Sequence, residues 1–232
     1  MKRLVSLGLV AMFALAAMTF SFPTNGKAQT AGLVSSAVNR MHNNQRSMKS
    51  LRANITMEKY NAQLRDSDRY SGAVMYIPAA GRTAFVRIEW QSPQHEIITV
   101  AKGRYQAYRP RLNIVYEGNA NSSRNKAGGA LELMNMSTAQ LQSRFEQIQD
   151  AREETLWGGV KTTHLRVVPK GGASYKYAEV WVDDGGMPVQ TKVVEKNDDA
   201  TTVRLTNLQK NAPISMDEFT LKLDSSVKRV KG

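Results

Sequence analysis

The stretch Ala53-Asn54-Ile55-Thr56-Met57-Glu58 alternates apolar with polar side chains. Successive side chains of a β-strand point to opposite faces, so this stretch predicts a strand that is buried on one face. Similar alternation recurs in residues 73–77, 84–90, 112–116, 178–182, 203–205 and 219–223. Turn residues such as Lys102-Gly103, Gly158-Gly159 and Asp183-Asp184-Gly185-Gly186 join these stretches. The pattern predicts antiparallel strands in a sandwich or a barrel, and it excludes a parallel α/β fold.

Two segments have helical spacing instead. Residues 31–51 carry apolar side chains three or four positions apart, which predicts an amphipathic helix before the first strand. Further along, Ser137 and Gln140 form a capping-box pattern before Leu141, Phe145 and Ile148, which share one helical face. A polar, glycine-rich link over residues 118–129 precedes this segment. We therefore expect a helical insertion in the middle of the sheet.

The N-terminus has the pattern of an export signal. Met1-Lys2-Arg3 is followed by an apolar run from Leu4 to Phe22, and Gly26 and Ala28 are suitably small for cleavage after Ala28. The alternative is a retained membrane anchor, which Pro23 and the small residues disfavour. We expect residues 1–28 to be removed and residues 29–232 to form one domain in the periplasm. The mature chain keeps 29 basic and 20 acidic side chains, a net charge of +9.

Composition limits the chemistry that this chain can perform. The 232 residues include no cysteine, which excludes disulfides, thiolate metal sites, a thiol nucleophile and a lipid-modified N-terminal cysteine. His42, His95 and His164 are far apart in the sequence and are not spaced with carboxylates as metal ligands are. No nucleophile elbow, phosphate-binding loop or dinucleotide motif is present. We expect no enzymatic activity, no bound metal and no cofactor.

A cluster of basic and aromatic residues lies within residues 104–116. Arg104, Arg109 and Arg111 cluster with Tyr105, Tyr108 and Tyr116. Such a cluster suits stacked bases and phosphates, anionic lipid head groups, an acidic protein partner, or only solvent. Export disfavours nucleic acid. We therefore interpret the three arginines as a contact with head groups or a partner, with a solvated strand face as the alternative.

Several short motifs, taken together, resemble those of the outer-membrane lipoprotein carrier family, LolA-like and LolB-like. They are the glycine-led strand Gly72–Pro78, the segment Val86–Trp90 with Ser92-Pro93 after it, the hairpin Ile98–Gly103 with Tyr105–Tyr108 behind it, and the final segment Ile214–Leu221. The resemblance covers nearly the whole mature chain. It departs from the best-known carriers at Ile77, directly before Pro78. Those carriers have an arginine at this position, and that arginine tethers the lid.

The resemblance implies a mainly β fold with some helix. Its sheet would be strongly curved and antiparallel, an incomplete β-barrel, with an N-terminal helix and a mid-sheet helical lid over an apolar cavity. The strand residues expected to line this cavity, on alternation alone, are Ile55, Met57, Met75, Val86, Ile88, Trp90, Val180 and Val182. The residues expected to form the lid are Leu133, Met134, Met136 and Leu141. The several methionines suit an adaptable binding surface or plain core filling equally well.

The function that the resemblance implies is transport. A monomeric periplasmic carrier would take the acyl chains of lipoproteins, or other lipids, from an inner-membrane lipoprotein-releasing transporter to an outer-membrane acceptor. Without cysteine, the chain cannot itself be an acylated acceptor. The alternative is an envelope sensor domain of the same fold that binds lipoprotein or a signalling partner. Such sensors usually carry a further domain, whereas this sequence ends at Gly232.

Overall fold

The computed structural model describes residues 26–78, 84–120, 138–146, 148, 150–171 and 173–231. One sheet contains all the described strands, in the order β12-β6-β5-β4-β3-β2-β1-β11-β10-β9-β8-β7. The strands are β1 (Leu51–Asn61), β2 (Asp66–Ile77), β3 (Phe85–Ser92), β4 (Glu96–Ala101), β5 (Arg104–Arg109), β6 (Ile114–Asn119), β7 (Asp150–Leu156), β8 (Val160–Val167), β9 (Tyr175–Asp183), β10 (Pro188–Glu195), β11 (Ala200–Lys210) and β12 (Lys228–Lys231).

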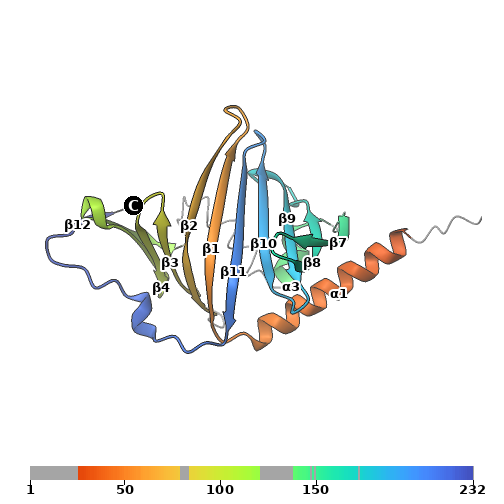
Figure 1. Cartoon of the computed structure of the whole chain (residues 1–232), viewed down its shortest axis with the longest axis horizontal. Helices are drawn as coiled ribbons and strands as arrows, with labels where there is room; N and C mark the ends of the chain where they lie inside the picture. Colours follow the sequence, from red (N-terminus) through yellow and green to blue (C-terminus); the bar gives the residue numbers. More distant parts are fainter. Residues whose placement is uncertain are drawn as a thin grey trace, which may run out of the picture.

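The sheet is open and curled, and it does not close into a barrel (Figure 1). Neighbouring strands are antiparallel except β12, which runs parallel to β6. The two meanders, β1 to β6 and β7 to β11, meet where β1 pairs with β11, for example at Ile55 opposite Leu205. This architecture confirms the prediction of a curved antiparallel sheet with an N-terminal helix.

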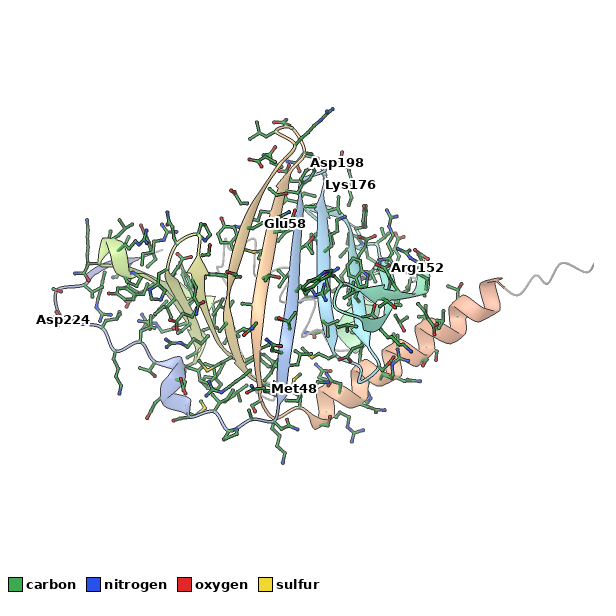
Figure 2. The ribbon with its side chains drawn as sticks, viewed as in Figure 1. Met48, Glu58, Arg152, Lys176, Asp198 and Asp224 are labelled. Carbon is green, nitrogen blue, oxygen red and sulfur yellow. The ribbon has the colours of Figure 1, made fainter. Side chains whose placement is uncertain are left out.

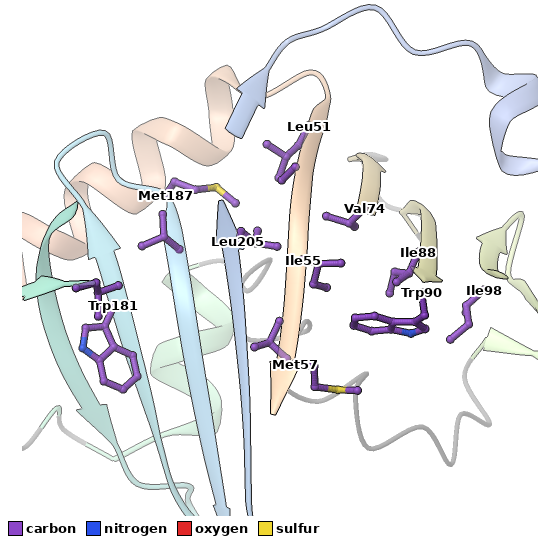
Figure 3. Packing of buried hydrophobic residues seen from close by; sticks show 14 of the residues in the cluster. Leu51, Ile55, Met57, Val74, Ile88, Trp90, Ile98, Trp181, Met187 and Leu205 are labelled. Atoms are coloured by element: carbon purple, nitrogen blue, oxygen red, sulfur yellow. The ribbon is translucent and has the colours of Figure 1, made fainter. Parts of the chain in front are cut away.

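Opposite residues in paired strands point to the same side, so the register defines two faces. We call the face that carries Ile55, Val74 and Ile88 the inner face, and its opposite the outer face. On the inner face Val74 lies opposite Ile88, and Ile88 lies opposite Ile98. The row continues through Ala107. Val74, Ile88 and Ile98 belong to the main hydrophobic cluster, against which Ala107 packs, and Figure 3 shows these three with Ile55 and Trp90.

Helix α1 (Gly26–Ser47) covers part of the inner face. Its Ala37 and Met41 pack with Leu165 and Val180, which lie opposite each other on β8 and β9. The helix ends at Ser47, four residues before the predicted end, because the chain turns there to begin β1 at Leu51. The expected cleavage site after Ala28 falls in the first turn of α1, and cleavage there stays a prediction.

Helix α3 (Thr138–Arg144) also packs on the inner face. Its Leu141 contacts two clusters, one of which contains Phe145, Val167 and Ala178. The predicted helix was expected to reach Ile148, but it ends at Arg144 because Phe145 forms a β-bridge with Pro169. The capping residue Ser137 and the glycine-rich link after Ala120 lie outside the described residues.

The segment after β11 crosses the outer face of the half of the sheet that β1 to β6 form. It contains the 3-10 helix η3 (Met216–Phe219) and ends in β12. Phe219 is buried and its ring packs against Phe85 of β3, with 5.8 Å between the ring centroids. The backbone N–H of Lys228 donates to the carbonyl oxygen of Asn113, which fixes β12 beside β6. The C-terminal segment therefore covers the face that lies behind Ile88.

Ion pairs occupy the exposed rim of the molecule. Lys176 of β9 pairs with Asp198 in the turn between β10 and β11, and both side chains lie near the strand tips in Figure 2. Arg152 of β7 pairs with Asp150 and Glu154 on its own strand. Exposed ion pairs contribute little to stability, on the order of 0.5 kcal/mol each. The apolar inner face therefore accounts for more of the folding free energy than this rim does.

Candidate functional site

The inner face of β1 to β4 carries a continuous cluster of buried apolar side chains. Ile55 lies opposite Gly72, and Gly72 lies opposite Trp90, so one cross-strand row joins β1, β2 and β3. Ile55, Ile88 and Trp90 are each less than 5% exposed. Met57 and Val86 belong to the same cluster. The structure thus brings five of the eight expected cavity residues together on one surface.

Gly72 allows the backbone of β3 to approach β2 closely beside Trp90. A Cβ atom at Gly72 would lie 2.1 Å from the carbonyl oxygen of Glu89, so no larger residue fits without moving β3. The register also shifts between Ser71 and Gly72, as in a β-bulge. The Trp90 ring meets the Tyr70 ring edge-on, with 5.8 Å between centroids. The glycine at the head of this motif is therefore required by the close approach of the β3 backbone.

Met75 does not share this surface. It lies opposite Arg52 of β1 and Arg87 of β3, whereas its neighbours Val74 and Tyr76 belong to the inner cluster. The expected position of Met75 on the apolar face is therefore wrong by one residue of register. Its thioether sulfur accepts a hydrogen bond from Arg52 Nη1 at 2.9 Å on the outer face.

Val180 and Val182 lie on the inner face, but beneath α1. Both are at most 2% exposed and pack with Ala37 and Met41 of the helix. Leu141, the expected lid residue in α3, packs on the same half of the sheet. The other expected lid residues, Leu133, Met134 and Met136, lie outside the described residues. Ile77, in the place of the family's tethering arginine, is the last residue of β2.

The three arginines that cluster in the sequence lie on different surfaces of the folded protein. Arg104 and Arg109 begin and end β5 and fall on opposite faces, with Arg104 exposed on the outer one. Arg111 is exposed in the 3-10 helix η1 (Pro110–Leu112). Arg109 lies on the inner face, beside Glu96. The sequence cluster is therefore not a single surface patch.

An ion pair ends the apolar row that passes through Trp90. Glu96 lies directly opposite Trp90, and its Oε1 accepts a hydrogen bond from Arg109 Nε at 2.7 Å. The Arg109 guanidinium also lies 5.4 Å from the ring centroid of Tyr116. The hydrogen bond with Glu96 raises the pKa of Arg109, so its charge is fixed. Sequence reasoning missed Glu96, although its position six residues after Trp90 across a tight turn was available as a signal.

The outer face behind this row holds a groove of about 510 Å³ between β3 to β5 and the C-terminal segment. Arg87, Ile97 and Tyr108 line its sheet side, and residues from Ser215 to Leu223 line the other. Arg52 Nη2 donates to Glu218 Oε1 at 3.0 Å, and Arg87 Nη1 donates to the Glu218 carbonyl oxygen at 3.0 Å. These contacts hold the C-terminal segment against the sheet.

Two histidines contact carboxylates, which their sequence spacing did not predict. His95 Nε2 lies 3.2 Å from Glu89 Oε1, and His164 Nε2 lies 3.5 Å from Glu179 Oε1. Burial raises the pKa of Glu89, but hydrogen bonds from Arg87 and His95 outweigh it and the net pKa is lowered. His164 lowers the pKa of Glu179 against the effect of burial.

The described residues contain no group of three or more potential metal ligands. His42, the third histidine, is exposed on α1.

Comparisons with known proteins agree with this geometry. A family model described as "Outer membrane lipoprotein carrier protein LolA" matches residues 48–222. A search of curated proteins finds no match. Among the helices that the structure describes, none combines the length and apolar character needed to cross a membrane.

Solved structures share the fold at low sequence identity. An uncharacterized conserved protein from Thermus thermophilus has a TM-score of 0.53 and 11% identity, covering 86% of this chain and 99% of that one. Lipoprotein LppX from Mycobacterium tuberculosis has a TM-score of 0.50 and 13% identity, covering 81% and 99%. MucB has a TM-score of 0.52 and 18% identity, and this chain spans 84% of its own length and 64% of the MucB chain.

An open curled sheet with helices on an apolar inner face, in a chain that this family model matches, defines a domain of the lipoprotein-carrier class. Such proteins bind or carry their ligands and do not transform them. The match covers most of the sequence. The chain belongs to the LolA family of outer-membrane lipoprotein carriers.

Proposed function

We propose that this protein is a periplasmic carrier that binds the acyl chains of lipoproteins, or of other lipids, on the inner face of β1 to β5. The observation that supports the proposal is the unbroken apolar row of Ile55, Trp90 and their neighbours on the concave side of an open sheet. Each methylene removed from water on such a surface contributes about 0.8 kcal/mol. One acyl chain would therefore bind reversibly, and several chains would bind tightly.

The carrier would receive its cargo from an inner-membrane lipoprotein-releasing transporter and pass it to an outer-membrane acceptor. Arg104 at the start of β5 and Arg111 in η1 are exposed, and they are proposed to contact an acidic surface of one of these partners. Exposed charges at the rim of an interface act mainly on association rates. In this proposal Met75 has no role in the cavity, and Leu133, Met134 and Met136 remain the proposed lid.

The experiment that tests the proposal is isolation of the exported protein from the cell envelope, followed by mass spectrometry of the molecules that copurify. We expect acylated peptides or phospholipids in the wild-type sample and a smaller amount with Ile88→Trp, because Ile88 lies at the centre of the inner face. Lys196→Gln, in the exposed turn between β10 and β11, is the matched control and should keep the wild-type amount. Protein that is free of acyl-bearing molecules and binds no fatty-acyl probe would contradict the carrier function and favour a sensor domain that binds a protein partner.

A further inference from the structure

The Glu96–Arg109 pair lies where the apolar row of the inner face ends. Glu96 is the cross-strand partner of Trp90, and Trp90 continues the row toward Ile55 through Gly72. A molecule that covers Ile55 and Trp90 with an apolar chain and extends toward β5 would therefore bring its other end to this pair.

Both partners keep open hydrogen-bonding capacity. The single bond between them uses Arg109 Nε and Glu96 Oε1. Within the part of the chain that the structure describes, the two terminal nitrogens of Arg109 and the Oε2 atom of Glu96 make no other hydrogen bond. The side chains of Arg109 and Glu96 are 43% and 23% exposed, so a ligand can reach them.

The charges of the pair select the class of head group. A purely anionic group that approaches Arg109 also meets the Glu96 carboxylate, and a purely cationic group meets the guanidinium. A group with both charges matches both partners. A phosphate diester accepts two hydrogen bonds from the planar guanidinium, and a primary ammonium donates to the free carboxylate oxygen. The ring of Tyr116, already beside Arg109, adds a surface that favours a cation.

We propose that Glu96 and Arg109 form a head-group site for a zwitterionic phospholipid that carries a phosphate diester and a primary ammonium, as phosphatidylethanolamine does. Its acyl chains lie on the inner face, so the inference rests on the proposed function. The phosphate binds Arg109 and the ammonium binds Glu96. The pair thus adds selectivity among lipids to an apolar surface that by itself distinguishes only chain length and volume.

The test is competition between a fluorescent fatty-acyl probe and two water-soluble lipids, dihexanoyl-phosphatidylethanolamine and dihexanoyl-phosphatidylglycerol. The two lipids have the same acyl chains and a phosphate diester, and only the ethanolamine lipid carries an ammonium group. We expect wild-type protein to prefer the ethanolamine lipid by about fivefold, since charge-assisted hydrogen bonds at a partly exposed site are worth about 1 kcal/mol. Glu96→Gln should abolish or reverse this preference, and Arg109→Gln should weaken both lipids by a similar factor.

Matched variants separate recognition from a structural role of the ion pair. Lys196→Gln, which removes an exposed positive charge from the turn between β10 and β11, should leave the ratio of the two lipids at its wild-type value. The double variant Glu96→Gln with Arg109→Gln keeps a neutral hydrogen-bonded pair between the strands and serves if either single variant unfolds. It should bind the two lipids equally.

The inference is overturned if wild-type protein binds both lipids equally or prefers phosphatidylglycerol, or if the ratio is the same in wild type, Glu96→Gln and the double variant. In those cases the probe still binds and the carrier function stands. Failure of the probe itself to bind wild-type protein contradicts the proposed function, and the head-group site with it.

Discussion

The two halves of the sheet are covered on opposite faces. In the half formed by β7 to β10, α1 and α3 pack on the inner face over Val180 and Leu165. In the half formed by β1 to β6, the C-terminal segment packs on the outer face and buries Phe219 against Phe85. The halves share one continuous inner surface through the pairing of β1 with β11.

The half that α1 and α3 cover supports the fold, and the other half carries the proposed binding surface. The helix-covered half has helical side chains packed tightly against its strands, so added volume there must displace the helix. The proposed binding surface lies in the other half, whose outer face is already secured by Arg52, Arg87 and Phe219. In the proposed function, the inner side of this half binds the ligand. Substitutions in the two halves should therefore have different consequences.

The largest effect is expected where α1 meets the turn between β9 and β10. Gly186 has φ +78°, and a Cβ atom there would lie 2.1 Å from the carbonyl oxygen of Arg40 in α1. Gly186→Ala should lower the free energy of unfolding by about 3 kcal/mol, from left-handed strain of about 1–2 kcal/mol and displacement of the helix. Chemical denaturation with urea measures it.

Gly159→Ala is the matched control for that variant. Gly159 has φ +77°, but a Cβ atom there would have no neighbour within 4 Å. This substitution should cost only the strain, about 1 kcal/mol. Equal losses in the two variants would show that α1 does not pack against this turn as closely as the structure indicates.

A pair of tryptophan substitutions compares the inner faces directly. Val180→Trp beneath α1 should overpack the core and lower the free energy of unfolding by about 2 kcal/mol, with little effect on probe binding. Ile88→Trp should change stability by less than about 1 kcal/mol and reduce fatty-acyl probe binding about tenfold or more, because the new ring occupies the ligand's surface. Denaturation midpoints and probe titrations measure the two effects.

The reverse outcome is equally informative. If Ile88→Trp destabilises the protein as much as Val180→Trp and wild-type protein binds no probe, the inner face of β1 to β4 is an ordinary filled core. The distinction between a supporting half and a binding half would then be lost.

Much of this comparison could be predicted from sequence, because alternation is clear where polar residues interrupt it. Ile55, Met57, Ile88 and Trp90 were placed on one face correctly. Residues 73–77 are all apolar or small, so alternation could not set their phase. The bulge at Ser71 and Gly72 and the pairing with β1 set it instead, and Met75 points outward.

Other features depend on contacts between distant residues. The pairing of β1 with β11 joins segments about 150 residues apart, and no local pattern encodes it. Met48 and Leu51 continue the apolar spacing of α1, yet the chain has already turned and both join the core of the sheet. The arginine cluster divides because strand alternation and the turn at Pro110 send neighbouring arginines in different directions. Sequence spacing gives proximity along the chain, and register decides proximity in space.

The smallest effect concerns the carboxylates that contact histidines on the outer face of each half. The lowered pKa of Glu179 means that its charged form stabilises the fold at pH values above 4.5, the ordinary value for this side chain, and that the contribution is lost as the pH falls through the lowered pKa. Glu179→Gln should therefore be less stable than wild type at pH 7 and lose less stability on acidification to pH 3. Glu89→Gln should show the same sign with a smaller amplitude, because the side chain of Glu89 is 34% exposed and that of Glu179 is 16% exposed. Urea denaturation of both variants across this pH range, with the exposed Glu153→Gln as the control, measures the difference. Curves for Glu179→Gln and Glu153→Gln that run parallel to wild type would show that the contact with His164 contributes nothing to folding.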